Sequence, residues 1–376
     1  MCGISGFISF TGSLTLEQLT RTGKIMVDTL SHRGPDDSGI WCDAESGISL
    51  GHRRLSIIDL SEHGHQPMLS HDGRYVMVLN GEIYNHIELR KELVGQGYQF
   101  RGTSDTEVAV CAIQQWGIEA ALTKFIGMFA FCIWDREKKR LFLARDRIGE
   151  KPLYYGKFKN TFAFASELKA LKVHPDWSGD IDRDALAQLL QYTYIPSPQS
   201  IYTGIFKLIP GTYVEMSGRN LAEEIIAKTY WSLNDVVLGG MASRQERRDT
   251  QLTIDQLDTL LSDTIRDKMI ADVPLGAFLS GGIDSSLIVA LMQSQSTKPV
   301  RTFSIGFNES EYNEATYAKE VARYLGTDHT ELYVTPEDTL SVIPRIPELY
   351  DEPFSDSSQI PTFLVSQLAR RDVTVA

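Results

Sequence analysis

The sequence lacks any apolar run near the roughly 18 residues that a membrane-spanning helix requires, and its N-terminus has no basic region followed by an apolar stretch. We therefore expect neither a membrane span nor a secretory signal. Basic residues are also in deficit, because 37 Lys and Arg face 49 Asp and Glu, and the formal net charge is −12. That charge disfavours nonspecific binding to nucleic acid or to an anionic membrane.

Cysteine is scarce, and the four cysteines form no CxxC pair, which argues against a structural zinc site. Scattered thiols in a chain of 376 residues predict a reducing, cytoplasmic location. Cys111 and Cys132 lie in the apolar segments EVAVCAI and MFAFCIW, so we expect both to be small buried side chains. Cys2 belongs to no apolar pattern, and its place at the chain end needs another explanation. The eight histidines show no ligand spacing.

The first 175 residues or so alternate strand-like runs with two helical segments. RYVMVLNGEIYN is typical of a strand, and NHIELRKELVGQGY and TEVAVCAIQQWG are typical of helices. MFAFCIWDREKKRLFLARDR predicts a hairpin, because two apolar runs flank the charged tip Asp135–Arg140. These patterns predict an α+β domain built on packed β-sheets.

The pattern changes further along the chain. SLNDVVLGGMASRQERRDT, residues 232–250, contains two adjacent glycines and a charge run, which is typical of a linker or an exposed loop. After residue 250 strands alternate with helices, as in a parallel sheet, and the chain ends in the strand-like VTVA. We expect domains at 1–210 and 251–376, joined by a connecting segment at 211–250.

The stretch FLSGGIDSS, Phe278–Ser286, lies between a predicted strand and a predicted helix. Its glycines let the backbone approach a ligand, and the following helix N-terminus offers free N–H groups to an anion. Asp284 adds a carboxylate suited to Mg²⁺. No GK[ST] follows, so this is not a Walker A loop.

SGGIDSS resembles the pyrophosphate loop of the ATP pyrophosphatases. CGISG with HRGPD (His32–Asp36), NGEIYN (Asn80–Asn85) and SDTE (Ser104–Glu107) resembles the class II glutamine amidotransferases. Both sets in this order are similar to glutamine-hydrolysing asparagine synthetases. The resemblance implies an αββα Ntn-hydrolase sandwich followed by an α/β ATP pyrophosphatase domain with a parallel sheet, which is incomplete here.

Cys2 then has a role. If Met1 is removed, Cys2 carries a thiol nucleophile and an α-amine with a pKa of about 7.7–8.0, which can act as general base. The resemblance implies that the Asn80 side chain and the Gly81 N–H form the oxyanion hole. It also implies a glutamine pocket made by Arg54, Leu55, Ser56, Ile57, Ile58, Asn80, Gly81, Glu82 and Asp105. From the residues alone, two structural alternatives stay open: Arg54 is a structural arginine at a strand edge, and Asp105 is a helix N-cap.

For the second domain the resemblance implies that ATP, with Mg²⁺, adenylates the aspartate β-carboxylate and that ammonia displaces AMP. The implied ATP contacts are Leu279, Ser280, Gly281, Gly282, Asp284, Ser285, Ser286 and Ile305, with Asp284 as metal ligand. The implied substrates are glutamine, aspartate and ATP. No nucleic acid or membrane partner is expected, and a homodimer stays open.

The family pattern includes a second loop, SG[DE]GxDE, after a strand like VTVA, and these 376 residues end before it. We therefore expect this chain to act only as a glutaminase, with apolar faces of PLGAFLS and VRTFSIGF exposed. Two alternatives stay open. The acceptor is another carboxylate, for example in surface-polysaccharide biosynthesis, or the chain is a stand-alone glutaminase module.

Overall fold

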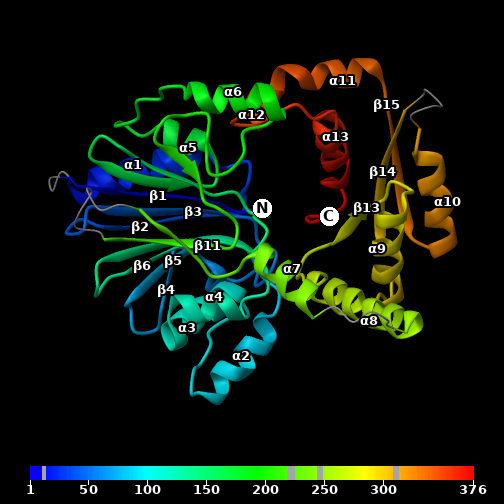
Figure 1. The fold of residues 1–376 in the computed structure, drawn as a ribbon, viewed down its shortest axis with the longest axis horizontal. Coiled ribbons are helices and arrows are strands. Elements are labelled where there is room, and N and C mark those ends of the chain that lie inside the picture. The colour runs from blue at the N-terminus through cyan, green and yellow to red at the C-terminus, as the bar shows by residue number, and fades with distance from the viewer. Residues whose placement is uncertain (11–13, 218–224, 244–248, 308–312) are drawn as a thin grey trace. The chain divides into compact units, whose positions relative to one another are not determined.

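The computed structural model describes residues 1–10, 14–217, 225–243, 249–307 and 313–376 (Figure 1). The chain forms two compact units. The first comprises Met1–Ser243 and Asp351–Phe354, and the second comprises Arg244–Tyr350 and Ser355–Ala376. Among the described residues, no helix combines the length and the apolar character that crossing a membrane would take.

Two six-stranded antiparallel sheets form the first unit. The strands of the first sheet, in spatial order, are β10 (Ile205–Lys207), β8 (Tyr154–Phe158), β9 (Thr161–Ala165), β1 (Gly3–Ser9), β3 (Ile48–Arg54) and β2 (Asp37–Asp43). Those of the second sheet are β12 (Ala227–Thr229), β11 (Thr212–Ser217), β7 (Arg140–Arg145), β6 (Gly127–Asp135), β5 (Tyr75–Ile83) and β4 (Met68–Leu69).

Helices cover the outer faces of both sheets. The helices of this unit are α1 (Leu16–Asp28), α2 (His86–Gly95), α3 (Asp105–Trp116), α4 (Ile118–Lys124), α5 (Leu168–Lys172), α6 (Arg183–Tyr192), α7 (Leu233–Ala242) and the short η1 (Glu62–Gly64). One core cluster joins α1, α5 and α6 to the first sheet, and another joins α2, α3 and α4 to the second. A third cluster lies between the sheets, so the predicted αββα sandwich is confirmed.

Strand alternation sorts side chains between these clusters, because successive residues of a strand point to opposite faces. In β1, Ile4 and Ile8 enter the core between the sheets, whereas Phe7 packs with the helices outside. In β5, Val78 enters the core between the sheets and Leu79 packs outside. The site described below depends on this alternation.

The second unit contains a parallel sheet in the order β13 (Gly276–Phe278), β14 (Arg301–Phe307) and β15 (Asp328–Val334). Its helices are α8 (Thr250–Lys268), α9 (Ile283–Ser294), α10 (Ala315–Leu325), α11 (Pro336–Val342), η3 (Ile343–Arg345), α12 (Ile346–Leu349) and α13 (Gln359–Ala369). A single parallel bridge joins Leu275 to Val375, so the strand expected at VTVA is reduced to this isolated bridge.

Several sequence-based expectations need correction. Among the described part of the first 175 residues there are five α-helices rather than two, because α1, α4 and α5 were missed. The expected loop at 232–250 contains α7, and residues 244–248 of its charge run lie outside the described residues. β11 and β12 belong to the second sheet, so the first unit continues past residue 210.

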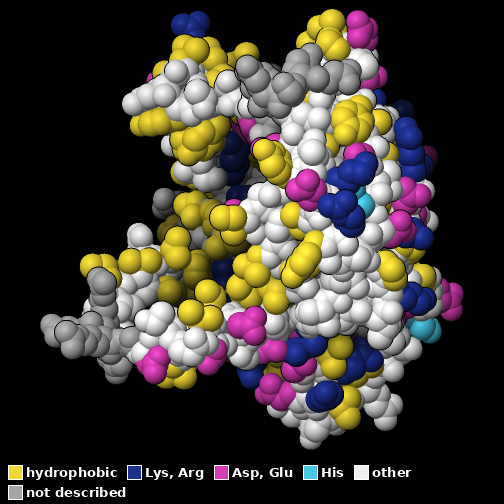
Figure 2. All heavy atoms as spheres, turned by 90° about the vertical axis from the view of Figure 1, so that its right-hand side faces the viewer, with side chains coloured by type: hydrophobic (Ala, Val, Ile, Leu, Met, Phe, Trp, Pro, Cys, Tyr) yellow, Lys and Arg dark blue, Asp and Glu magenta, His cyan; other side chains and the backbone are white. Residues whose placement is uncertain are grey.

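The expected exposure of PLGAFLS and VRTFSIGF is also largely wrong. Leu279 and Phe303 are buried, because α9 and α10 cover one side of the sheet and α13 contributes to the core around Phe303. Only Phe278 is substantially exposed among the large apolar residues of these two strands. Figure 2 shows hydrophobic side chains interspersed with charged and polar ones on the face that it draws, and α8 exposes Leu252, Leu257 and Leu260.

Asp146 is a buried structural carboxylate at the end of β7. It accepts hydrogen bonds from the backbone N–H groups of Phe129, Ile148, Glu150 and Lys151 at 2.8–3.2 Å. Removing it would leave several buried donors without partners, so Asp146→Ala should lower the free energy of unfolding by about 3 kcal/mol.

Urea denaturation followed by tryptophan fluorescence can measure this, because all five tryptophans belong to the first unit. The exposed neighbour Glu150 supplies the control, and Glu150→Ala should stay within about 0.5 kcal/mol of the parent. Equal stabilities of the two variants would contradict the role of Asp146.

Candidate active site

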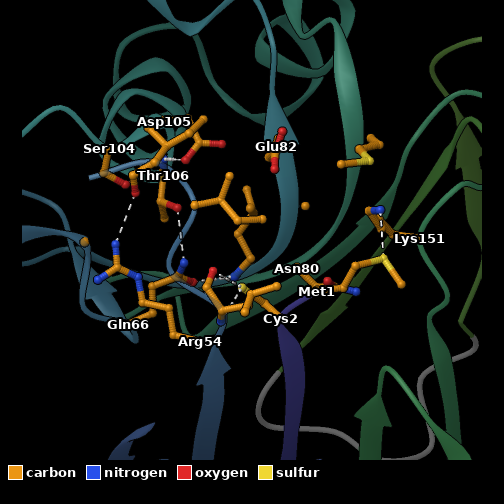
Figure 3. A pocket seen from close by; sticks show the side chains of 17 residues that line it. Met1, Cys2, Arg54, Gln66, Asn80, Glu82, Ser104, Asp105, Thr106 and Lys151 are labelled. Atoms are coloured by element: carbon orange, nitrogen blue, oxygen red, sulfur yellow. Dashed lines mark hydrogen bonds between the residues drawn. The ribbon is translucent and has the colours of Figure 1, made fainter. Parts of the chain in front are cut away.

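A small cavity lies at the end of the core between the two sheets (Figure 3). Cys2 precedes β1 and Arg54 ends β3, while Asn80 and Glu82 lie on β5. Each continues the alternation of the apolar residues that fill the core, so the four side chains point into the gap between the sheets. The sandwich therefore ends in a polar pocket that draws on both sheets.

Cys2 places its thiol inside this pocket. Its Sγ lies 3.4 Å from the Leu55 N–H, which donates to it, and 3.6 Å from the Leu55 carbonyl oxygen. Burial raises the pKa of the thiol, although the Leu55 backbone, the N-terminal ammonium and Arg54 act in the opposite direction. A thiol with a raised pKa is mostly protonated near neutral pH, so it needs a base to become a nucleophile.

Asn80 is fully buried, yet neither its Nδ2 nor its Oδ1 has a hydrogen-bond partner. Buried amides are almost always paired, and an unpaired one costs free energy. Gly81 follows with φ +149°, and a Cβ there would lie 2.0 Å from the Met128 carbonyl oxygen. The pocket therefore contains an unpaired amide beside a backbone position where only glycine fits.

Arg54 is held by the loop that follows β3. Its Nη1 donates to the Ser61 carbonyl at 3.1 Å, and Nη2 donates to those of Ile58 and Asp59. Gly64 makes room for the guanidinium, because a Cβ there would lie 1.8 Å from Nη2. These bonds orient the group but occupy several of its donors. Arg53 lies on the opposite face of β3 and pairs with Asp28 of α1.

Asp105 and Glu82 supply buried carboxylates to the same pocket. Asp105 accepts hydrogen bonds from the N–H groups of Ile83 and Thr106 at 2.9 and 2.8 Å. Burial raises its pKa, while these bonds and His86 oppose the shift. The N-cap of α3 is Ser104, so the N-cap interpretation of Asp105 is wrong.

Sequence reasoning missed several residues that support the pocket. Arg33 Nε donates to the Cys2 carbonyl at 2.8 Å. Gln66 links both sides of the site: its Oε1 accepts from the Leu79 N–H at 2.7 Å and its Nε2 donates to Thr106 Oγ1 at 3.1 Å. Arg33 lies in the HRGPD motif, which was a usable signal, whereas nothing in the sequence marks Gln66.

The cavity is small, about 40 Å³, and Met1 and Lys151 close part of it. Lys151 Nζ lies 3.1 Å from Met1 Sδ, and burial lowers the pKa of this lysine. Removing Met1 would free the α-amine of Cys2 and enlarge the space beside its thiol.

A second cavity, of about 440 Å³, lies within the second unit. Leu279, Ser280 and Ile305 line it, together with Phe278, Phe303, Ser304, Phe307, Glu314, Ala315, Pro361, Thr362 and Val365. The other expected ATP contacts, Gly281, Gly282, Asp284, Ser285 and Ser286, form the adjoining loop and the first turn of α9 rather than the lining.

The loop is preorganised by its own hydroxyl groups. The Ser280 N–H donates to Ser285 Oγ at 3.2 Å, the two serine hydroxyls lie 3.0 Å apart, and the Gly282 N–H donates to Ser280 Oγ. No side chain caps α9 at Gly282, so the N–H groups of its first turn stay open to an anion. Within the described ranges, no group of three acidic, histidine or cysteine residues is placed to hold a metal.

Family models match both units. A model described as a glutamine amidotransferase domain matches residues 1–231, and one described as asparagine synthase matches residues 256–376. The putative glutamine-hydrolysing asparagine synthetase 2 of Methanocaldococcus jannaschii is 37% identical over 399 residues, which cover all of this chain and 73% of that protein. The chain belongs to the glutamine-hydrolysing asparagine synthetase family.

The chain spans a smaller share of other members of the family. The chain is 36% identical to glutamine-hydrolysing asparagine synthetase 1 of Bacillus subtilis and spans 57% of it. It is 31% identical to the amidase chry2 of Gibberella zeae over 87% of this chain and 50% of that protein. The chain therefore spans little more than half the length of several relatives.

For this asparagine synthetase family member, the predicted glutamine pocket residues are largely brought together. Cys2, Arg54, Leu55, Ile57, Ile58, Asn80, Gly81, Glu82 and Asp105 all line the first cavity. Ser56 does not, and its N–H instead donates to Asp36 Oδ2 at 2.8 Å. The roles of these residues stay predictions.

The buried thiol leads to a testable pH dependence. In the protein that retains Met1, alkylation of Cys2 by iodoacetamide should reach half its maximal rate above about pH 8.5, the ordinary value for cysteine, because only the thiolate reacts. Mass spectrometry of the N-terminal peptide separates Met1-retaining from processed chains, and N-acetylcysteine gives the unshifted reference. A midpoint below that of the reference would show that burial does not control this thiol.

Proposed function

We propose that the first unit hydrolyses glutamine with Cys2 as the nucleophile. The observation that carries the proposal is the buried, unpaired Asn80 amide in the same cavity as the Cys2 thiol. An amide left without a partner beside a nucleophile is suited to an oxygen that becomes negative during the reaction.

The mechanism follows from the groups in the pocket. After Met1 removal, the Cys2 α-amine takes the thiol proton, and Sγ attacks the side-chain carbonyl carbon of glutamine. Asn80 Nδ2 and the Gly81 N–H donate to the resulting oxyanion. The protonated α-amine then gives its proton to the leaving nitrogen, which departs as ammonia and leaves a thioester. Water hydrolyses the thioester to glutamate and restores the thiol.

Charged groups in the pocket can orient the amino-acid end of glutamine. We assign the α-ammonium to Asp105 and Glu82, whose carboxylates line the cavity. We assign the α-carboxylate to the N–H donors of Arg54 that the loop carbonyls leave available, since a guanidinium has five. The loop after β3 thus orients the Arg54 guanidinium before the substrate binds.

For the second unit we propose that ATP binds in the cavity lined by Leu279 and Ile305, with its phosphates on the loop Ser280–Ser286. The open N–H groups at the start of α9 support this placement. Asp284 supplies one carboxylate for Mg²⁺, which usually completes its shell with substrate phosphates and water. Aspartate is the acceptor we infer from the family, and asparagine the product.

A second candidate function for the second unit is transfer of ammonia to a carbonyl or carboxylate other than that of aspartate. It is favoured by the relative that is named an amidase. All four cysteines are unpaired, which supports a protein of the reducing cytoplasm.

Cys2→Ala tests the nucleophile. It should abolish glutamate release from glutamine and leave any ammonia-dependent synthesis intact, because only the glutaminase step needs the thiol. Cys42→Ala is the matched control, since Cys42 is a half-buried thiol of β2 outside the cavity. Glutaminase activity that survives in Cys2→Ala would refute the assignment.

Asn80→Leu tests the oxyanion hole. The substitution keeps roughly the same shape but removes the donor, so kcat for glutamine hydrolysis should fall about 100- to 1,000-fold with little change in KM. Steady-state kinetics measure both constants. Asn160→Ala, which removes an exposed amide in the turn between β8 and β9, should change neither. A rise in KM alone would instead place Asn80 in ground-state binding.

A further inference from the structure

A short segment from late in the chain belongs to the amidotransferase unit. Asp351–Phe354 lies in the sequence between α12 and α13, yet it is part of the same compact unit as residues 1–243. Only about a tenth of the side-chain surface of Asp351, and of Glu352, is exposed. Carboxylates are rarely buried unless they are paired, and here each has its own lysine: Lys169 for Asp351 and Lys207 for Glu352.

A series of polar contacts connects Asp351 to Cys2. The Lys169 backbone N–H donates to Asp351 Oδ2 at 3.1 Å, and Lys169 Nζ lies 3.7 Å from Oδ1. The same Nζ lies 2.8 Å from Glu167 Oε2. Glu167 Oε1 accepts a hydrogen bond from Arg33 Nη1 at 2.7 Å. Arg33 Nε donates to the Cys2 carbonyl at 2.8 Å, which completes the chain of contacts.

The charges along this series of contacts, from Asp351 to Arg33, balance. Arg33 and Lys169 are cations, Glu167 and Asp351 are anions, and His32 adds a further contact to Glu167. Its three basic neighbours lower the pKa of Glu167 to about 2 against the effect of burial. Removing one charge from a buried set leaves another uncompensated, so the remaining groups must rearrange.

Loss of the Asp351 charge would leave Lys169 with Glu167 as its main partner. Arg33 and Lys169 share that one carboxylate through its two oxygens, so a reorientation of Lys169 would move the Glu167 carboxylate and with it the contact to Arg33. The Cys2 carbonyl is fixed by Arg33, and the peptide that contains it sets the directions of the thiol and the α-amine. Small displacements of reacting groups change rates strongly.

We propose that Asp351 is a positioning residue for glutamine hydrolysis, which orients Cys2 through Lys169, Glu167 and Arg33. The inference rests on the proposed glutaminase function. The segment Asp351–Phe354, which lies in the sequence between α12 and α13, would then help to align the nucleophile.

Glu352 offers a matched control within the same segment. It accepts hydrogen bonds from the Ile201 N–H at 2.7 Å and from Tyr154 OH at 3.3 Å, and it pairs with Lys207 Nζ at 2.6 Å. These contacts hold the segment in place but do not lead to Arg33. A role in docking alone would therefore make Glu352 as important as Asp351.

The experiment compares Asp351→Asn with Glu352→Gln in the intact chain. Asp351→Asn should lower kcat for glutamine hydrolysis about tenfold with KM within twofold of the parent, because glutamine contacts are retained while the nucleophile is misplaced. Asp351→Glu, which keeps the charge, should recover part of the loss. Glu352→Gln should stay within twofold in both constants. Thermal unfolding of each variant identifies any loss of folded protein.

Two further measurements distinguish a failure of the positioning role from a failure of the proposed glutaminase function. The rate of Cys2 alkylation by iodoacetamide should change in Asp351→Asn but not in Glu352→Gln, and this readout does not depend on glutaminase activity. In the double variant with Lys169→Met, the effect of Asp351→Asn should largely disappear, because the two residues act in one chain.

An active parent with an unchanged Asp351→Asn variant would overturn the positioning role and leave the proposed function standing. Equal losses in the two segment variants would overturn it in favour of docking alone. An inactive parent would refute the proposed function, and the alkylation rates would then decide on the chain of contacts by themselves.

Discussion

The packing of two sheets face to face is the constraint on which the site depends. Each strand must send alternate side chains into the core between the sheets, where only apolar groups are stable without partners. At one end of the sandwich the same alternation continues with Cys2, Arg54, Asn80 and Glu82. The strands that build the core therefore also aim the reactive side chains, and no separate scaffold is needed to bring both sheets to one point.

Burial at this end of the sandwich affects each polar group differently. Arg54 is held by loop carbonyls and Asp105 by backbone N–H groups, so both are oriented before any ligand binds. Cys2 is only weakly contacted, and desolvation keeps its thiol protonated. Asn80 has no partner at all. The groups that would change partners during a reaction are thus the ones that the fold leaves least satisfied.

Sequence patterns predicted the parts of this arrangement that depend on local order. The strand-like run RYVMVLNGEIYN contains β5, and the apolar surroundings of Cys111 and Cys132 predicted their burial. Contacts between distant segments left no such pattern, because Arg33 and Glu167 are 134 residues apart and Gln66 meets Thr106 from a loop. Helix α7 was missed since two glycines were taken as a break, although an exposed helix tolerates them at a cost of about 1 kcal/mol each.

The unpaired Asn80 amide carries a stability cost, of about 1–3 kcal/mol for a buried group of this kind. A leucine or valine at that position would continue the apolar pattern of Val76 and Val78 and extend the core between the sheets. The sequence instead places an amide there, followed by a glycine whose backbone admits no side chain. Both residues weaken β5 as a strand and gain nothing from packing, so their combination is explained by an oxygen that arrives with the substrate rather than by the fold.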